Sequence, residues 1–113
     1  MKPESRFRVN TINPFLKKLP HTKYFSIQQT SIRGTPDYLI CVMGCFVGME
    51  VKDDDNPKGL DPLQKDNKFL IERAGGLHIS VSQTGKSPGT ISWEKAVELL
   101  TVLSKGEMKW ASR

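Results

Sequence analysis

The sequence has few cysteines and histidines and no long hydrophobic run. Its only cysteines are Cys41 and Cys45, and its only histidines are His21 and His78. Two thiols do not make a disulfide framework, and a structural zinc site needs four Cys or His ligands, so neither class of small protein is indicated. The longest uncharged apolar-rich run covers residues 39–49. Since a membrane-spanning helix needs about 20 residues, we expect no transmembrane segment.

The chain also lacks internal repeats, low-complexity linkers and the apolar stretch of a secretory signal peptide near its first residues. We therefore expect a cytoplasmic protein. With 113 residues, of which 37% are hydrophobic and 26% charged, the composition is typical of a folded globular protein and not of a disordered chain. Domains commonly have roughly 100–200 residues, so residues 1–113 are predicted to form a single domain.

The basic residues of the chain are in excess and unevenly distributed. The sequence has 17 Lys and Arg against 12 Asp and Glu, a formal net charge of +5. Residues 1–36 carry seven bases and one acid, residues 37–61 carry two bases and six acids, and residues 62–113 carry eight bases and five acids. Basic flanks can hold phosphate around an acidic segment that binds a cation, so the pattern indicates a polyanionic partner.

The first third of the chain predicts a helix followed by a strand. Pro3 and Glu4 favour a helix start, because proline fits the first turn and an acid complements the helix dipole there. Pro14 predicts a break or kink, since it lacks the amide proton of a helix interior. Residues 24–29 are β-prone and predict a strand. The apolar side of the helix comprises Phe7, Ile12, Phe15, Leu16 and Leu19.

Two apolar runs, residues 37–42 and 45–52, predict a β-hairpin. Met43-Gly44 lies between them, where a two-residue turn requires residues that tolerate positive φ. A turn centred there pairs residues whose numbers sum to 87. Because side chains alternate between the faces of a strand, this register puts Cys41 and Cys45 on opposite faces, which argues against a disulfide or a shared metal.

A second helix is predicted from its capping residues. Asp61 is a good N-cap, Pro62 takes the first helical position, and Gln64 occupies the third position as in a capping box. Gly75-Gly76 predicts the C-terminal end of this helix. One shared apolar face is expected to hold Leu63, Leu70, Ile71 and Ala74.

The remaining elements complete the predicted fold. Residues 77–82 alternate as a strand, and Ser92 caps a last helix whose apolar face begins with Trp93. Because a helix separates the third and fourth strands, we expect those two strands to be parallel. The predicted fold class is α/β, with a small mixed β-sheet flanked by helices in the order α-β-β-β-α-β-α.

The hairpin brings charged side chains together in a segment otherwise built for burial. Its register places Asp37 opposite Glu50, with Cβ atoms roughly 4.5–5.5 Å apart, and Lys52 emerges on the same face as Glu50. Two adjacent carboxylates repel each other unless a cation lies between them. Oxygen ligands favour Mg²⁺ or Mn²⁺, and such an ion can polarise a phosphate while Lys52 stabilises charge. A purely structural cluster at two strand ends fits this geometry equally well.

A longer pattern extends beyond these three residues. Gly34-Thr35-Pro36-Asp37-Tyr38-Leu39-Ile40 is followed by Phe46-Val47-Gly48-Met49-Glu50-Val51-Lys52, then by Gln64 and by Ala74-Gly75-Gly76. The core of this pattern resembles the PD-(D/E)xK nuclease signature. The whole, over residues 4 to about 82, is similar to the virus-type replication-repair nuclease (VRR-NUC) family, especially its short stand-alone phage and bacterial members.

This resemblance implies a restriction-endonuclease-like core that cuts DNA with Mg²⁺ or Mn²⁺. On the matching positions, it implies that Asp37 and Glu50 are metal ligands and that the backbone carbonyl of Val51 completes the ligation. Lys52 matches the catalytic lysine of the family.

Three further residues are interpreted one by one. Gln64 matches the glutamine that helps to organise the site in the family, although a capping-box role alone would also explain it. Glu4 matches the first-helix glutamate, which implies a further metal or water ligand. His78 lies on a predicted strand and is interpreted as a structural residue and not as a general base.

Several basic residues are candidates for DNA contacts, because half or more of protein–DNA hydrogen bonds go to the sugar–phosphate backbone. Arg33 precedes the Gly-Thr-Pro-Asp turn, and Lys58 lies in the loop before the second helix. Lys17, Lys18 and Lys23 form a basic cluster around the end of the first helix. Each of the five is equally compatible with an ordinary surface charge.

The chain is too short to hold a separate DNA-reading domain, so we expect shape and backbone contacts to dominate substrate choice. Short VRR-NUC members resemble homodimeric Holliday-junction resolvases, and a two-fold dimer presents one active site to each of two symmetric strands of a four-way junction. The leading hypothesis is a structure-selective, junction-resolving DNA endonuclease. The alternatives are a monomeric flap- or nick-directed nuclease, a catalytically silent DNA-binding module, and a scaffold domain that binds no nucleic acid.

Overall fold

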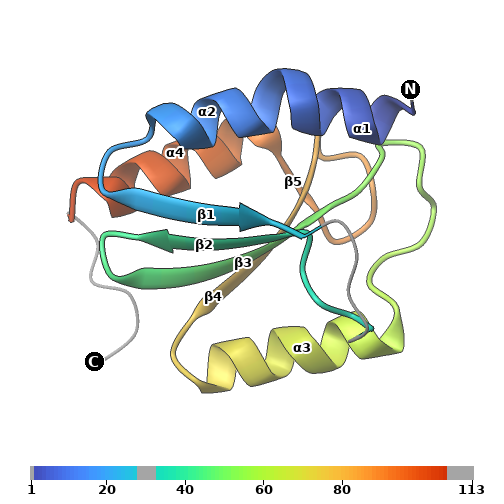
Figure 1. The fold of residues 1–113 in the computed structure, drawn as a ribbon. Coiled ribbons are helices and arrows are strands. Elements are labelled where there is room, and N and C mark those ends of the chain that lie inside the picture. Colours follow the sequence, from blue (N-terminus) through green and yellow to red (C-terminus); the bar gives the residue numbers. More distant parts are fainter. Residues whose placement is uncertain (1, 28–32, 107–113) are drawn as a thin grey trace.

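The computed structural model describes residues 2–27 and 33–106, and their elements follow the predicted order with one short strand added (Figure 1). Most element bounds lie within a few residues of the predicted ones. The elements are α1 (Pro3–Phe7), the π-helical η1 (Arg8–Ile12), α2 (Asn13–Lys18), β1 (Thr22–Ser26), β2 (Tyr38–Val42), β3 (Cys45–Val51), α3 (Pro62–Arg73), β4 (Leu77–Ser82), β5 (Ile91–Ser92) and α4 (Trp93–Ser104).

The strands form one mixed sheet in the order β1-β2-β3-β4-β5. β1, β2 and β3 are antiparallel neighbours, whereas β3 pairs with β4, and β4 with β5, in parallel. The helices of the N-terminal segment and α4 cover one face of the sheet, and α3 lies on the other (Figure 1). The α/β class and the parallel third and fourth strands are thereby confirmed. β5 was not predicted, because two residues directly before a helix are too few to show strand periodicity.

The hairpin has the predicted register. Tyr38 pairs with Met49 and Cys41 with Phe46, so paired numbers sum to 87. Met43 and Gly44 both have positive φ, 47° and 79°, as a two-residue type I′ turn requires. The predicted opposite placement of the two thiols is also confirmed, since Cys41 is exposed and Cys45 is buried.

Of the break or kink predicted at Pro14, the break does not occur. The chain remains helical from Pro3 to Lys18, but the turn over Arg8–Ile12 is π-helical, and the N–H of Asn13 donates to the carbonyl of Arg8. Pro14 cannot donate to the preceding turn, and the wider turn before it absorbs the missing hydrogen bond without ending the helix. The strand predicted from residue 24 begins at Thr22 instead, and its predicted last two residues, 28–29, lie outside the described residues.

The main core lies between the sheet and the helices on its α4 face. Trp93 packs edge-on against Phe7 and Phe15, with ring centroids 5.8 and 5.4 Å apart, which makes it a core residue. Apolar burial on this face supplies the main stabilisation of the fold. The fully buried apolar side chains of this layer include Ile12, Leu16, Tyr38, Ile40, Val42, Val47, Met49, Val81, Ala96 and Leu100.

Helix α3 begins and ends as predicted but does not bury its apolar face. Its capping box is complete at Asp61 and Gln64, and Gly75, with φ 92°, closes it. Leu63 and Leu70 are nevertheless 42% and 57% exposed, and α3 has no buried residue. The helix touches the sheet narrowly through Ile71, whose side chain lies over Gly48 and Gly76. Within residues 2–27 and 33–106, no helix is long and apolar enough to cross a membrane.

Gly34 allows the loop before β2 to pass against the start of α3. Its φ is +83°, and a Cβ added there would lie 2.7 Å from the carbonyl carbon and oxygen of Leu63. Real Cβ atoms do not approach backbone so closely. The glycine of the Gly-Thr-Pro-Asp motif therefore lets Asp37 and the first turn of α3 occupy the same end of the sheet.

We expect Gly34→Ala to destabilise the protein more than Gly44→Ala. Both glycines have positive φ, but no atom of the described residues lies within 4 Å of a Cβ added at Gly44. The conformational cost of about 1–2 kcal/mol is common to both variants, and the clash at Gly34 adds about 1–3 kcal/mol. Urea unfolding of the two variants measures the difference, and equal losses would contradict the close approach to α3.

Candidate functional site

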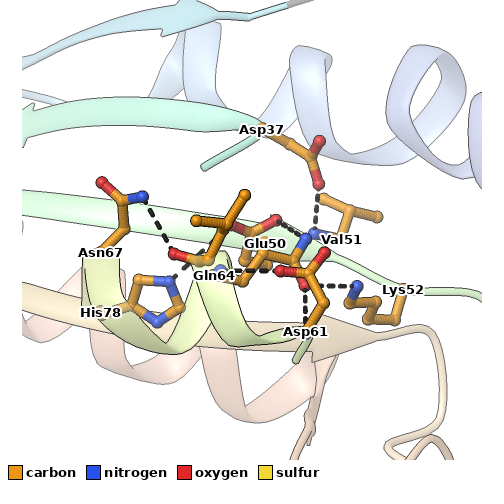
Figure 2. Close-up of polar contacts among 9 residues, drawn as sticks. Asp37, Glu50, Val51, Lys52, Asp61, Gln64, Asn67 and His78 are labelled. Carbon is orange, nitrogen blue, oxygen red and sulfur yellow. Dashed lines mark hydrogen bonds and ion pairs between the residues drawn. The ribbon is translucent and has the colours of Figure 1, made fainter. Parts of the chain in front are cut away.

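The sequence motif converges at the end of the sheet where β2 begins and β3 ends. Asp37 directly precedes β2, Glu50 is the second-last residue of β3, and Lys52 directly follows β3. Figure 2 shows these side chains together with Gln64 from the first turn of α3. The pairing of β2 with β3 stops at Tyr38 and Met49. Beyond it, an Asp37 carboxylate oxygen accepts a hydrogen bond of 2.7 Å from the Val51 N–H.

Glu50 is a buried carboxylate that is only partly compensated. The residue is 1% exposed. Its Oε1 accepts a hydrogen bond of 3.2 Å from Gln64 Nε2, whereas its Oε2 has no hydrogen-bond partner among the described residues. Burial raises the pKa of Glu50, nearby His78 opposes the rise, and Asp37 adds to it. Because burial penalises the ionised form, this oxygen is suited to accept a proton or a cation.

His78 stands beside the unpaired oxygen. Its Nε2 lies 4.0 Å from Glu50 Oε2, and both side chains are almost fully buried. The parallel register pairs Glu50 with Ser80 and Gly48 with His78, which puts the histidine on the same sheet face as the glutamate. The position of His78 beside Glu50 was not predicted from the sequence. The alternation of side chains along the parallel strands β3 and β4 is the signal that could have indicated it.

Gln64 fills both of the roles that were considered for it. Its Oε1 accepts a hydrogen bond of 3.0 Å from the Asp61 backbone N–H, which completes the capping box. The same oxygen accepts a hydrogen bond of 3.1 Å from Lys52 Nζ, while Nε2 donates to Glu50. The start of α3 therefore orients the ammonium group and one carboxylate at the site (Figure 2).

Asp37 is held from two sides. Burial raises its pKa, and the hydrogen bond from the Val51 N–H opposes the rise, as do the charges of Arg8 and Lys52. Arg8 Nη1 lies 3.9 Å from Asp37 Oδ1. Arg8 was not a predicted site residue, but its position four residues after Glu4 in the same helix places both on one side of that helix.

Glu4 lies close to the other charged groups of the site. Burial raises its pKa, followed in importance by the charge of Asp37, while Arg8 and Lys52 oppose the rise. Together with Lys52 and Asp53 it lines a small pocket between the first helix and the segment after β3. The structure thus brings Glu4 to the site as expected.

The residues of the site fit a hard divalent cation that takes oxygen ligands. Asp37 and Glu50 offer carboxylate oxygens beside the backbone of Val51, and the buried Glu50 Oε2 has no hydrogen-bond partner within the described ranges. Oxygen donors without thiolate or a second imidazole favour Mg²⁺ or Mn²⁺ over zinc. Among residues 2–27 and 33–106, no three His, Cys, Asp or Glu side chains are grouped closely enough to hold an ion by themselves. Water or substrate oxygens would have to complete the coordination.

The five candidate DNA-contacting residues lie in different places. Arg33 is exposed beside Gly34, near the start of α3, and Lys58 is exposed in the loop before that helix. Lys17 and Lys18 end α2, and Lys23 pairs with Cys41 toward the hairpin turn. Because Ser26 and not Lys23 is opposite Tyr38, the last three lysines lie away from the Asp37 end of the sheet.

Comparison of the chain with protein-family models, with curated proteins and with solved structures gives no match. The arrangement of the side chains at this site therefore carries the functional argument.

When both proteins are kept metal-free with EDTA, we expect Glu50→Gln to unfold at the same temperature as the unaltered protein or at a higher one. The substitution removes a buried negative charge and keeps the shape that accepts the Gln64 hydrogen bond. A gain of about 1 kcal/mol corresponds to roughly 4 °C in a domain of this size. Glu94→Gln, at an exposed position of α4, is the control. A large drop for Glu50→Gln alone would show that its ionised form stabilises the metal-free fold.

Proposed function

We propose that the protein is a Mg²⁺- or Mn²⁺-dependent endonuclease that hydrolyses phosphodiester bonds in DNA. The observation that carries this proposal is the buried, incompletely paired Glu50 beside Asp37, with Lys52 oriented by Gln64. Two carboxylates and an ammonium group at one end of the sheet suit metal-assisted attack of water on a phosphate. The resemblance to the VRR-NUC family, which rests on the same residues, supports the proposal as well.

Each side chain would have a distinct task. A divalent cation bound by Asp37 and Glu50 would polarise the phosphate and lower the pKa of an attacking water. The Val51 N–H holds the Asp37 carboxylate in place. Lys52 contributes an ammonium group that stabilises developing negative charge, and its hydrogen bond to Gln64 fixes its direction. Gln64 also holds Glu50 Oε1, which leaves Oε2 for the cation.

We further propose that the substrate is branched DNA, with the four-way junction as the leading candidate and a homodimer as the active form. The support is the family resemblance together with the net charge of +5, which favours binding to a polyanion. One active site in each chain cuts one strand, so a two-fold dimer would cut the two symmetric strands of a junction.

Cleavage assays with variants test the site. Junction, flap, nicked and linear DNA are incubated with Mg²⁺ or Mn²⁺, and products are resolved on denaturing gels. We expect no detectable cleavage by Asp37→Asn or Glu50→Gln, because each removes a charged metal ligand. Lys52→Ala should cleave about 10²–10³-fold more slowly, which is typical for the loss of one charge-stabilising group. Asp55→Asn, in the exposed part of the adjacent loop, should cleave normally.

The assay also separates the alternatives. DNA binding by the unaltered protein without cleavage of any substrate would establish a silent DNA-binding module on this fold. Cleavage by Asp37→Asn or Glu50→Gln at the normal rate would show that the site is elsewhere. A mass measurement in solution distinguishes a dimer from a monomer, and preferred cutting of flaps by a monomer would replace the junction hypothesis.

A divalent cation should also stabilise the folded protein through this site. We expect added Mg²⁺ or Mn²⁺ to raise the melting temperature of the unaltered protein, since a ligand that binds only the folded state shifts unfolding by mass action. Glu50→Gln should lose most of this response, whereas Asp55→Asn should keep it. Differential scanning calorimetry across a metal titration measures both effects, and an equal response in all three proteins would contradict the assigned ligands.

A further inference from the structure

Arg8 is fixed near the acidic site mainly by contacts other than its contact with Asp37. Its Nη2 donates a hydrogen bond of 3.0 Å to Ser26 Oγ, at the end of β1. Its guanidinium carbon lies 5.1 Å from the centre of the Tyr38 ring, within the range of a cation–π interaction. The distance of 3.9 Å from Nη1 to Asp37 Oδ1 is longer than a hydrogen bond. The guanidinium is therefore held beside Asp37 and not clamped onto it.

This placement leaves the guanidinium able to serve a second anion. A guanidinium has five N–H donors, and among the described residues its hydrogen-bonding neighbours besides Asp37 are Ser26 Oγ and the Tyr38 side chain. Its planar fork matches the oxygens of a phosphate in a bidentate arrangement. Arg8 is also the first residue of the π-helical turn, and such turns are frequent at functional sites.

A charge count shows what the arginine does to cation binding. The site holds three carboxylates, from Glu4, Asp37 and Glu50, and two cations, from Arg8 and Lys52, so its formal charge is −1 when all five groups are ionised. A divalent ion alone would change this to +1. A divalent ion together with one phosphodiester would bring it to zero. Without Arg8, the divalent ion alone would already neutralise the site.

We propose that Arg8 couples the binding of the divalent cation to the binding of a substrate phosphate. Without DNA, the guanidinium compensates Asp37 and weakens cation binding. When a phosphodiester arrives, its oxygens accept hydrogen bonds from the guanidinium, and its negative charge offsets the repulsion between the guanidinium and a cation at Asp37. Arg8 thus acts through the metal ligand Asp37 as a positioning residue. As a result, the site binds its divalent cation tightly only when the substrate is present. This inference rests on the proposed function, because it takes the anion to be a DNA phosphate.

Calcium and junction DNA provide the test, since thermodynamic linkage requires each ligand to strengthen the other by the same factor. Calorimetry measures Ca²⁺ affinity of the full chain without DNA, and fluorescence anisotropy measures junction affinity in Ca²⁺ and in EDTA, with gels to verify that the DNA stays intact. We expect Ca²⁺ to tighten DNA binding by about 5–150-fold in the unaltered protein. In Arg8→Gln, we expect Ca²⁺ affinity without DNA to rise about tenfold and the coupling factor to fall several-fold, to the part that direct contact between the cation and the phosphate supplies.

Matched variants separate coupling from a merely structural role. Arg8→Lys keeps the charge but not the fork, so it should keep the weak Ca²⁺ affinity of the free protein and lose most of the coupling. Arg6→Gln, at an exposed position of the same helical segment, should change neither quantity. Circular dichroism at the assay temperature verifies that each variant is folded. A structural role alone would lower Ca²⁺ affinity in Arg8→Gln, because a disordered Asp37 binds a cation less well.

The outcomes distinguish this inference from the proposed function. Efficient cleavage by the unaltered protein with a coupling factor near one would overturn the role of Arg8 and leave the nuclease proposal standing. Coupled binding of Ca²⁺ and DNA that weakens in Arg8→Gln, without cleavage of any substrate by the unaltered protein, would support Arg8 and refute the nuclease. A fall in the Ca²⁺ affinity of folded Arg8→Gln without DNA would also overturn the inference.

Discussion

The buried carboxylate of Glu50 is the constraint on which the rest of this site depends. Removing a carboxylate from water is unfavourable unless hydrogen bonds or opposite charges replace the lost hydration. One oxygen of Glu50 accepts the Gln64 hydrogen bond, and the other lies 4.0 Å from His78 with no hydrogen-bond partner in the described part of the chain. The protein therefore keeps a buried carboxylate with only partly compensated charge at the end of its sheet. Incompletely compensated buried charges are typical of functional sites, where the bound ligand supplies the opposite charge.

The start of α3 turns a local folding signal into part of the site. The capping box at Asp61 and Gln64 would satisfy the first turn of any helix, yet here the same glutamine also contacts Lys52 and Glu50. Gly34 and Gly48 let the loop before β2, the sheet and α3 approach closely enough for these contacts. Helix α3 buries little apolar surface, so its polar contacts at the site and the narrow packing at Ile71 define its position.

The parts of the fold that follow from nearby residues were predictable. The hairpin register, the ends of α3 and the N-cap of α4 depend on residues within a few positions of one another. The outcome at Pro14 was not predictable in the same way, because the π-helical turn over Arg8–Ile12 shifts the hydrogen bonds before the proline, and no local pattern in the sequence indicates such a turn. The separation of Lys23 from the site likewise follows from the register of β1 against β2.

The sequence alone determined that Asp37 and Glu50 would meet across one hairpin, because a two-residue turn and strict strand alternation leave one register. It also determined the helix start that carries Gln64. Only the tertiary structure decided that Glu50 would be buried beside His78 and that Arg8 would reach Asp37 from the first helix. Those contacts join groups 28 and 29 residues apart in the chain. Their distances are set by the packing of strands and helices in separate layers, and no local sequence pattern predicts that packing.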